Sequence, residues 1–318
     1  MHFTYFWRIL TDKRFRAALR YRLPPNSGGT IGNDYDYYLT TATIIKNEAR
    51  FLQEFVVFHQ LAGVDHMLIY DDESEDEVRG VLLPFIESGF VELIPWPRFQ
   101  KNRNGQFLAY QHAIGYMRRR SHWLAMIDCD EFLFSPSGNN LKDELRKREK
   151  FPAIGVYSRT FGTSGLDEIP DGGLVLEYLT KRPPDGFHKN RTQRTVVQPM
   201  HATAVRSANA VILATTSGLG WDEAGEKILK TGEECHSAGA LRINHYFTRA
   251  RGDFNRKIAR QYFGKAKWSH KMQGKSNEAD EMDTENITDT EIQKFLPRLK
   301  ECLLQINTNV LEDFSTGK

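Results

Sequence analysis

From about residue 40, apolar and polar positions alternate in a way that predicts strands and helices in turn. The β-branched segment LTTATIIK (39–46) predicts a buried strand. In the next segment, EARFLQEFVVFHQLAG (48–63), apolar residues recur at helical spacing, and Gly63 is placed to end the helix. HMLIYDD (66–72) then predicts a second strand that ends in two acids.

The alternation continues up to residue 134. Ser74 and Glu77 form an S-x-x-E capping box, which predicts the start of a helix over 75–89 with a kink at Pro84. The later elements are a third strand over FVELIPW (90–96), a helix over QFLAYQHAIGYMRR (106–119), and one continuous fourth strand over HWLAMIDCDEFLF (122–134).

Polar residues gather at the predicted strand ends. Alternating strands and helices imply right-handed βαβ units and a largely parallel sheet, and such α/β sheets bind ligands beyond the carboxyl ends of their strands. Three polar clusters follow those ends, at Lys46–Glu48, Asp71–Asp72 and Asp128–Asp130. A solvated surface does not require three acidic clusters on one rim, so we expect the functional site there.

The regular alternation stops after about residue 150. A helix is predicted over GDFNRKIARQYF (252–263) and a final helix over Thr288–Asn307. We expect this half to extend and cap the sheet, and we divide the chain into a basic arm and linker (1–39), a catalytic domain (40–265) and a polar linker with a C-terminal helix (266–318). The short strands predicted in this half are AIGVYSRTF, LVLEYLT, TVVQP, AVILATT and ALRINHYFT.

Composition excludes several classes of function. The net charge is only +2, from 43 basic and 41 acidic residues, so no general field favours a nucleic-acid partner. The three cysteines are widely spaced and include no CxxC pair, which disfavours a disulfide framework or a cysteine zinc site. The sequence has no apolar run of about 18 residues and no secretory signal pattern, so we expect a cytoplasmic protein.

The first 23 residues, MHFTYFWRILTDKRFRAALRYRL, mix aromatic and basic side chains. One interpretation is a helix docked on the domain with its basic face solvated. The other is an interfacial helix that holds the protein at an anionic membrane surface, at the inner face of the membrane. The stretch PPNSGGTIGND (24–34) is typical of a linker.

The strongest chemical signal is Asp128-Cys129-Asp130-Glu131. In a strand, alternation would point Asp128 and Asp130 the same way and Cys129 and Glu131 the other way. Two converging carboxylates suit Mg²⁺ or Mn²⁺, with coordination positions left for substrate phosphates. The plain alternative is a pair of capping or salt-bridging acids. Glu131 either orients the site from behind or pairs with a basic residue.

Several segments at compatible spacing resemble glycosyltransferase family 92. They are IIKNEARFLQEFVVFHQLAGVDHMLIYDDES, LLPFIESG, QFLAYQHA, WLAMIDCDEFLF, TFGTSG, VVQP with its following His201, and INHYFTRARGDFNRKIA. The resemblance implies a GT-A-type α/β nucleotide-binding fold with a mostly parallel central sheet. It also implies a bound metal, Mn²⁺ or Mg²⁺, and a UDP-sugar donor. The donor-binding residues would be Lys46, Asn47, Glu48, Asp71, Asp72, Gln106 and Asp128, and the metal ligands Asp128, Asp130 and His245.

The histidines and late cations carry weaker signals. His245 in INHYFTR matches a late metal-binding histidine of GT-A enzymes, and neutral imidazole suits Mn²⁺; a lone strand histidine is otherwise usually a satisfied residue. His201 is a lesser candidate for the same role. Arg249, Arg251 and Lys257 either clamp the diphosphate or are solvated cations near the start of a helix.

Inverting transfer needs a carboxylate near the acceptor hydroxyl. Asp167 and Glu168 follow TFGTSG on a loop, and Asp222 with Glu223 is a second option. The function expected from the resemblance is a metal-dependent, inverting hexosyltransferase that acts on a glycan acceptor. Two alternatives stay open: a phosphatase of the haloacid dehalogenase type, which Phe132 and the preceding βα steps oppose, and a non-catalytic carbohydrate-binding protein.

Overall fold

The computed structural model describes residues 35–97, 105–207, 210–213, 220–221, 225, 227–228, 239–262, 277, 279–284 and 287–316. The basic arm predicted over 1–23 and the linker over 24–34 lie outside these residues, and so does Asp222 with its neighbour Glu223.

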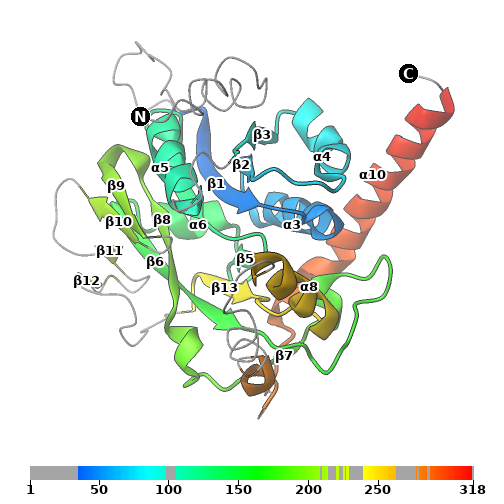
Figure 1. Cartoon of the computed structure of the whole chain (residues 1–318). Helices are drawn as coiled ribbons and strands as arrows, with labels where there is room; N and C mark the ends of the chain where they lie inside the picture. Colours follow the sequence, from blue (N-terminus) through cyan, green and yellow to red (C-terminus); the bar gives the residue numbers. More distant parts are fainter. Residues whose placement is uncertain are drawn as a thin grey trace, which may run out of the picture.

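A block of four parallel strands forms one half of the central sheet (Figure 1). Its spatial order is β3-β2-β1-β4, and every neighbouring pair in the block is parallel. This confirms the α/β class and the strands expected before residue 127. The strands are β1 (Tyr37–Ile45), β2 (His66–Asp71), β3 (Val91–Pro95) and β4 (Ser121–Met126).

Helices cover both faces of this block. On one face lie α3 (Ala49–Ala62) and α4 (Val78–Glu87), and on the other lies α5 (Gly105–Met117) (Figure 1). Along β1, Leu39 packs into the cluster that contains α3, whereas Ala42 packs into the cluster that contains α5. Strands buried on both sides need apolar residues at nearly every position, which explains why they lack polar alternation.

The second half of the sheet is mixed. Strand β8 (Gln193–Val197) runs antiparallel between β4 and β6 (Ala153–Thr160). Beyond β6 the sheet continues with β11 and β12, and the short pair β5–β13 is joined to β6 through β13. The expected extension of the sheet is therefore present. The remaining strands are β5 (Glu131–Phe134), β7 (Lys181–Arg182), β9 (Ala202–Ser207), β10 (Ala210–Leu213), β11 (Gly220–Trp221), β12 (Lys227–Ile228), β13 (Arg242–His245) and β14 (Ile287–Thr288).

The C-terminal segment packs against the parallel block and then extends away from it (Figure 1). It comprises η3 (Glu291–Phe295) and α10 (Leu296–Thr316), so the final helix begins later than predicted. Ile292 and Leu299 belong to the same core cluster as α3. No helix within the described ranges has the length and apolar character needed to cross a bilayer. The division at residues 39 and 265 stays a prediction.

One predicted strand is a helix. The segment LVLEYLT forms α7 (Val175–Tyr178) because the buried Glu54 carboxylate accepts hydrogen bonds from the backbone N–H of Val175 and Leu176, at 2.8 and 2.9 Å. The side chain comes from α3, far away in sequence. A tertiary contact has thus overridden the local preference for a strand, as β propensity commonly allows. The other short helices are α6 (Leu141–Arg146), α8 (Arg251–Tyr262), η1 (His188–Arg191) and η2 (Pro199–His201).

The predicted capping box is also wrong. Helix α4 starts after Glu77 with no side-chain cap, and the Ser74 hydroxyl instead accepts a hydrogen bond from the backbone N–H of Asn47, at 2.9 Å. Ser74 therefore joins two loops at the carboxyl end of the sheet instead of starting a helix.

Candidate functional site

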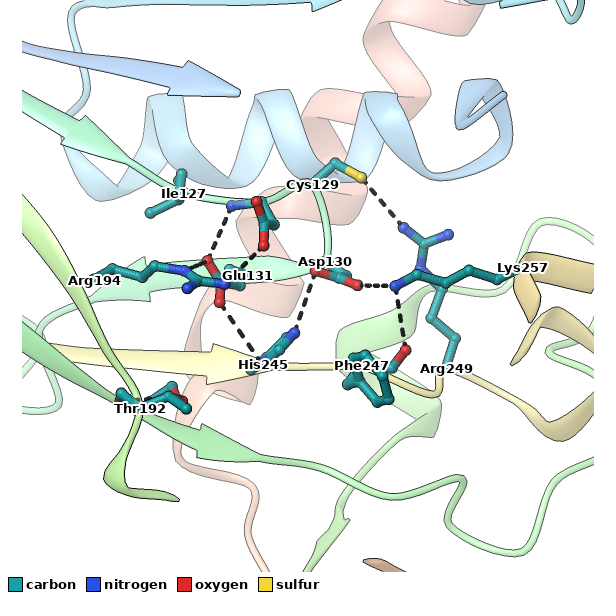
Figure 2. Close-up of polar contacts among 12 residues, drawn as sticks. Ile127, Cys129, Asp130, Glu131, Thr192, Arg194, His245, Phe247, Arg249 and Lys257 are labelled. Carbon is teal, nitrogen blue, oxygen red and sulfur yellow. Dashed lines mark hydrogen bonds and ion pairs between the residues drawn. The ribbon is translucent and has the colours of Figure 1, made fainter. Parts of the chain in front are cut away.

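The predicted fourth strand breaks where the acidic motif lies. Strand β4 ends at Met126, and β5 begins at Glu131 and pairs with β13. A turn joins them, with the backbone N–H of Glu131 donating to the carbonyl of Asp128 at 3.0 Å. Strand alternation therefore does not apply to Asp128 and Asp130, and each carboxylate has its own partners. Those of Asp130 are seen in Figure 2.

Asp128 lies on the β8 side of this turn. One of its carboxylate oxygens accepts a hydrogen bond from Gln106 at 2.5 Å and lies 3.2 Å from the Tyr110 hydroxyl. The other oxygen pairs with the guanidinium of Arg194 at 2.7 Å. Arg194 also binds Glu131 at 2.6 Å, so one buried cation is shared by two carboxyl groups.

Asp130 lies on the α8 side of the turn. Its Oδ2 accepts a hydrogen bond from the Lys257 ammonium at 2.6 Å, and its Oδ1 is 3.5 Å from His245 Nε2. Burial by itself would raise the pKa of Asp130, but Lys257 and His245 hold that pKa well below its usual range. Asp130 is therefore an anion with two different basic neighbours.

Glu131 lies behind the histidine. Its Oε1 is 3.7 Å from His245 Nδ1, and its side chain is only 1% exposed. It shares Arg194 with Asp128, so the prediction that it faces the same way as Cys129 is wrong. Burial raises the pKa of Glu131 in spite of Arg194. Both roles left open by the sequence are compatible with this position: it pairs with a basic residue, and it stands where a carboxylate can orient a metal-binding imidazole.

The chemistry of these donors fits a divalent cation. Among the residues that the structure describes, no three His, Cys, Asp or Glu side chains form a metal site by themselves. Asp130 Oδ1 and His245 Nε2 are nevertheless oriented toward one another (Figure 2). Mg²⁺-type ions in phosphate-transfer sites commonly take only one or two protein ligands and complete their shell with water and substrate phosphates. One carboxylate and one imidazole give this number of protein ligands, and the imidazole suits Mn²⁺ better than Mg²⁺.

Arg249 fastens the acidic turn to the loop after β1. Its guanidinium binds Glu48 at 2.5 Å, approaches Cys129 Sγ at 3.7 Å, and lies 3.9 Å from the centre of the Phe51 ring. The residue is 6% exposed and has a left-handed backbone conformation, φ 51°. A non-glycine residue in that region is uncommon and is held there by its surroundings. Arg249 therefore makes its close ionic contact within the protein, with Glu48.

The loops after β1 and β2 are joined to each other. The Lys46 ammonium donates to the carbonyls of Asp72 and Glu73 at 2.9 and 3.1 Å, and the Asn47 side chain accepts from the backbone N–H of Glu75 at 2.7 Å. The carboxylate of Asp71 accepts from the N–H of Ser74 at 2.9 Å. The structure thus brings two of the three predicted clusters together on one rim, and Arg249 links the third.

The predicted base candidates fall in different places. Glu168 is exposed, and both of its oxygens pair with the guanidinium of Arg256 at 2.8 Å. Asp167 is exposed on the same loop. Beside them a cleft of about 650 Å³ is lined by residues of the β1–α3 loop, α3, this loop and α8, among them Asn47, Glu168 and Arg249.

Arg251 and His201, two further candidates from the sequence, lie away from the acidic turn. Arg251 pairs with Asp280 at 2.7 Å, and His201 lines a cleft with Tyr35 and His122 at the opposite edge of the sheet. Of the three late cations, only Lys257 contacts one of the two aspartates directly.

Sequence reasoning missed Arg194 and Tyr110. The only signal for Arg194 was a charged residue inside QRTVV, a short strand whose other members are polar or apolar and buried. An arginine buried in a strand must have an acidic partner, because an unpaired buried charge is costly. Tyr110 lies on α5 one turn after Gln106, and this spacing puts both side chains on the same helix face.

The chain was compared with known proteins. The model of the family described as Glycosyltransferase family 92 matches residues 36–294. A glycosyltransferase family 92 protein of Oryza sativa subsp. japonica is 28% identical over 212 residues, which cover 65% of this chain and 33% of the relative. A glycosyltransferase family 92 protein of Ricinus communis is 30% identical over 180 residues, which cover 55% of this chain and 32% of the relative. The chain spans about a third of the length of these curated relatives.

Solved structures give a more distant likeness. TarS from S. aureus, residues 1–349, aligns with a TM-score of 0.38 at 8% identity, over 74% of this chain and 68% of that one; its complex with UDP gives 0.36 at 8% identity, over 74% and 69%. The match to the family model extends from β1 to η3. It therefore includes the acidic turn, β13 and α8, and on this ground the chain belongs to glycosyltransferase family 92.

Proposed function

We propose that this protein transfers a sugar, a hexose in the simplest case, from a nucleotide diphosphate to a hydroxyl of a glycan, with a divalent metal and with inversion. The observation that carries the proposal is the convergence of Asp130, His245 and Lys257 beside the joined loops after β1 and β2. A diphosphate needs cations, and a nucleoside needs hydrogen-bonding loops next to them.

The donor would lie across the rim from the nucleoside loops to the acidic turn. Asn47, Asp71 and Asp72 supply amide and carboxylate groups that suit ribose hydroxyls and base N–H groups. Lys46 and Glu48 hold these loops through the contacts described above. We favour UDP, and the TarS complex with UDP is a structural neighbour that binds this nucleotide.

Asp130 and His245 are the proposed metal ligands. A bound Mn²⁺ or Mg²⁺ would supply Lewis-acid stabilisation of the diphosphate leaving group. Lys257 lies next to Asp130 and would donate hydrogen bonds to the same phosphate oxygens as negative charge develops on them. Asp128, which the sequence predicts as a second metal ligand, is assigned to positioning, because its oxygens already accept from Gln106 and Arg194.

The acceptor would approach through the cleft beside α8. Its hydroxyl oxygen attacks the anomeric carbon, the bond from that carbon to the β-phosphate oxygen breaks, and the hydroxyl proton passes to a carboxylate base. We assign the base to Asp167. Glu168 is held by both guanidinium nitrogens of Arg256, which keep its pKa below the usual value. Asp222 lies outside the described residues.

A thermal shift experiment tests the donor and the metal together. With UDP, GDP and CMP in turn, with and without Mn²⁺, we expect stabilisation that requires both the metal and a diphosphate nucleotide. Asp130→Asn should abolish this shift. Asp143→Asn, an exposed aspartate paired with Arg146 on α6, should leave it unchanged. Equal stabilisation of the Asp130→Asn variant would reject the proposed metal site.

The same experiment separates the alternatives. A haloacid dehalogenase-type phosphatase would respond to Mg²⁺ or phosphate alone and would hydrolyse a simple phosphomonoester. A non-catalytic carbohydrate-binding protein would respond to sugars and not to nucleotides. The membership of the glycosyltransferase family favours the transfer reaction over both.

A further inference from the structure

A second cleft lies at the edge of the sheet opposite the acidic turn. It has a volume of about 520 Å³ and is formed where β1 and β4 begin and β8 ends. Strand β4 runs from this edge to the acidic turn, and its residues advance by about 3.3 Å each, so the two sites are roughly 20 Å apart. The residues that line it are Tyr35, Tyr37, Tyr38, His122, Glu149, Gln198 and His201.

Aromatic rings meet at nearly a right angle in this cleft. The Tyr38 and His122 rings are stacked, with centres 5.1 Å apart and an interplanar angle of 6°. The Tyr35 ring stands edge-on to His122, at 5.1 Å and 86°. The Tyr38 hydroxyl donates to Glu149 at 2.7 Å, which fixes the corner in place. Two rigid aromatic planes give packing area at little cost in conformational entropy.

The side chains that line the cleft disfavour an anionic ligand. None of the seven lining residues is lysine or arginine, and Glu149 contributes a carboxylate. Burial lowers the pKa of His122, so this imidazole is neutral near pH 7. A nucleotide or another phosphate would therefore meet no compensating cation among these side chains.

One polar atom in the cleft lacks a partner. His122 Nε2 is buried and has no hydrogen bond among the described residues, and Glu149 Oε1 is 3.9 Å away from it. A buried nitrogen without a partner costs free energy unless another group or a water satisfies it. Because this nitrogen has almost no accessible surface, a ligand hydroxyl reaches the carboxylate of Glu149, which is 45% exposed, more readily than the imidazole.

We propose that this cleft binds a neutral oligosaccharide. A pyranose has an apolar C–H face, which suits the Tyr35 ring, and a rim of hydroxyls, which suits the exposed carboxylate of Glu149. Pockets with aromatic walls and a few polar groups are typical of small-ligand sites. The site would hold a glycan at a distance from the transfer reaction. Binding at this cleft goes beyond the proposed function and does not require it.

Saturation-transfer NMR on the full chain tests this directly. The probes are cellotetraose, maltotetraose and β-1,4-galactotetraose, with choline and tetragalacturonate as the cationic and anionic controls. We expect transfer to at least one neutral tetrasaccharide. Tyr35→Ala should raise its Kd about tenfold, whereas Tyr35→Phe, which keeps the ring, should stay within about threefold. Glu149→Gln should weaken binding by a similar factor, and thermal melting confirms that each variant is folded.

The active-site variant distinguishes this cleft from the donor site. Asp130→Asn and saturating UDP should leave tetrasaccharide binding unchanged. The proposal is overturned by a lack of transfer to all three neutral tetrasaccharides, by a preference for choline or tetragalacturonate, or by equal binding to Tyr35→Ala and wild type. It is also overturned if Asp130→Asn removes the binding. Because no turnover is measured, failure of the transfer proposal alone would not change these outcomes.

Discussion

The region from β1 to β5 contributes carboxylates to the candidate site, whereas the region from β8 to α8 contributes its cations and its histidine. Glu48, Asp128 and Asp130 come from the first region. Their partners Arg249, Arg194 and Lys257 come from the second, between 66 and 201 residues later in the chain. Neither region holds a neutralised site by itself.

The division of carboxylates and cations between the two regions explains how the carboxylates can lie close together. Carboxylates gathered at one rim would repel one another, and burial would further disfavour their ionised forms. Each is instead paired with a cation that the second region places at 2.5–2.7 Å. Asp130–Lys257 is next to an imidazole, and the side chain of Lys257 is 28% exposed. In the Glu48–Arg249 pair both side chains are buried, at 10% and 7% exposed. We therefore expect loss of the Asp130–Lys257 pair to lower turnover and loss of the Glu48–Arg249 pair to lower stability.

The largest effect is expected from Asp130→Asn. If Asp130 carries the metal, its loss should lower kcat roughly a thousandfold and remove the dependence of turnover on Mn²⁺ concentration. Asp128→Asn, in the same turn, should lower activity less and should keep the Mn²⁺ dependence. Transfer kinetics with a UDP-sugar over a range of Mn²⁺ concentrations measure both. Equal loss of Mn²⁺ dependence in the two variants would restore Asp128 as a metal ligand.

Breaking the buried Glu48–Arg249 pair should lower the stability of the protein and not its turnover. Arg249→Met would leave Glu48 as an uncompensated buried charge and should lower the free energy of unfolding by about 3 kcal/mol. Chemical denaturation measures this loss. The matched control is the double variant Glu48→Gln/Arg249→Met, whose loss should be smaller than the sum of the single losses. If the loss of the double variant equals the sum of the two single losses, the Glu48–Arg249 contact contributes no interaction energy. Its assignment as a stabilising pair would then be wrong.

Much of the fold could be predicted from the first region. Its strands and helices are local, periodic and bounded by clear signals such as Gly63, which adopts φ 108° at the end of α3. The exceptions depend on distant contacts. Segment 174–180 is drawn into a helix by Glu54, and the strand predicted over 122–134 breaks because β5 pairs with β13.

The acids of the site could be predicted, but their pairing could not. Acidic residues after apolar strands are visible in one sequence, because strand ends meet at one rim of a parallel sheet. The partners depend on how β8 and α8 are placed, and no local pattern specifies that Arg194 faces Asp128 or that Arg249 reaches Glu48. Family resemblance supplied His245, and the structure places it beside Asp130.

A smaller effect is expected from Lys257→Met. The ammonium that contacts Asp130 would be lost, and kcat/KM should fall roughly 10- to 100-fold if Lys257 stabilises the leaving diphosphate. The first residue of α8 offers a control, since Arg251 pairs with Asp280 and not with the acidic turn. Arg251→Met should change kcat/KM about twofold or less. Similar losses in both variants would mean that the second region contributes only general positive charge.

The smallest effect is expected at Glu54, which joins α3 to α7, an element between the two regions in the sequence, without touching the acidic turn. Burial raises its pKa from 4.5 to about 7, against the opposing effect of the N–H groups of Val175 and Leu176. The folded state thus binds more protons than the unfolded state between these values. Its contribution to stability is therefore complete below about pH 4.5 and is lost as the pH rises through about 7.

Glu54→Gln keeps one acceptor oxygen and replaces the other with an amide that cannot accept from an N–H. At pH 5 the variant should be about 1–2 kcal/mol less stable than wild type, and the difference should shrink as the pH rises toward 7 and beyond. Urea denaturation at several pH values measures both curves, with Glu87→Gln, exposed on α4, as the control. Parallel curves for wild type and Glu54→Gln would show that Glu54 is ionised in the folded protein. The junction between α3 and α7 would then depend on a buried charge, as the link between the two regions does at Glu48.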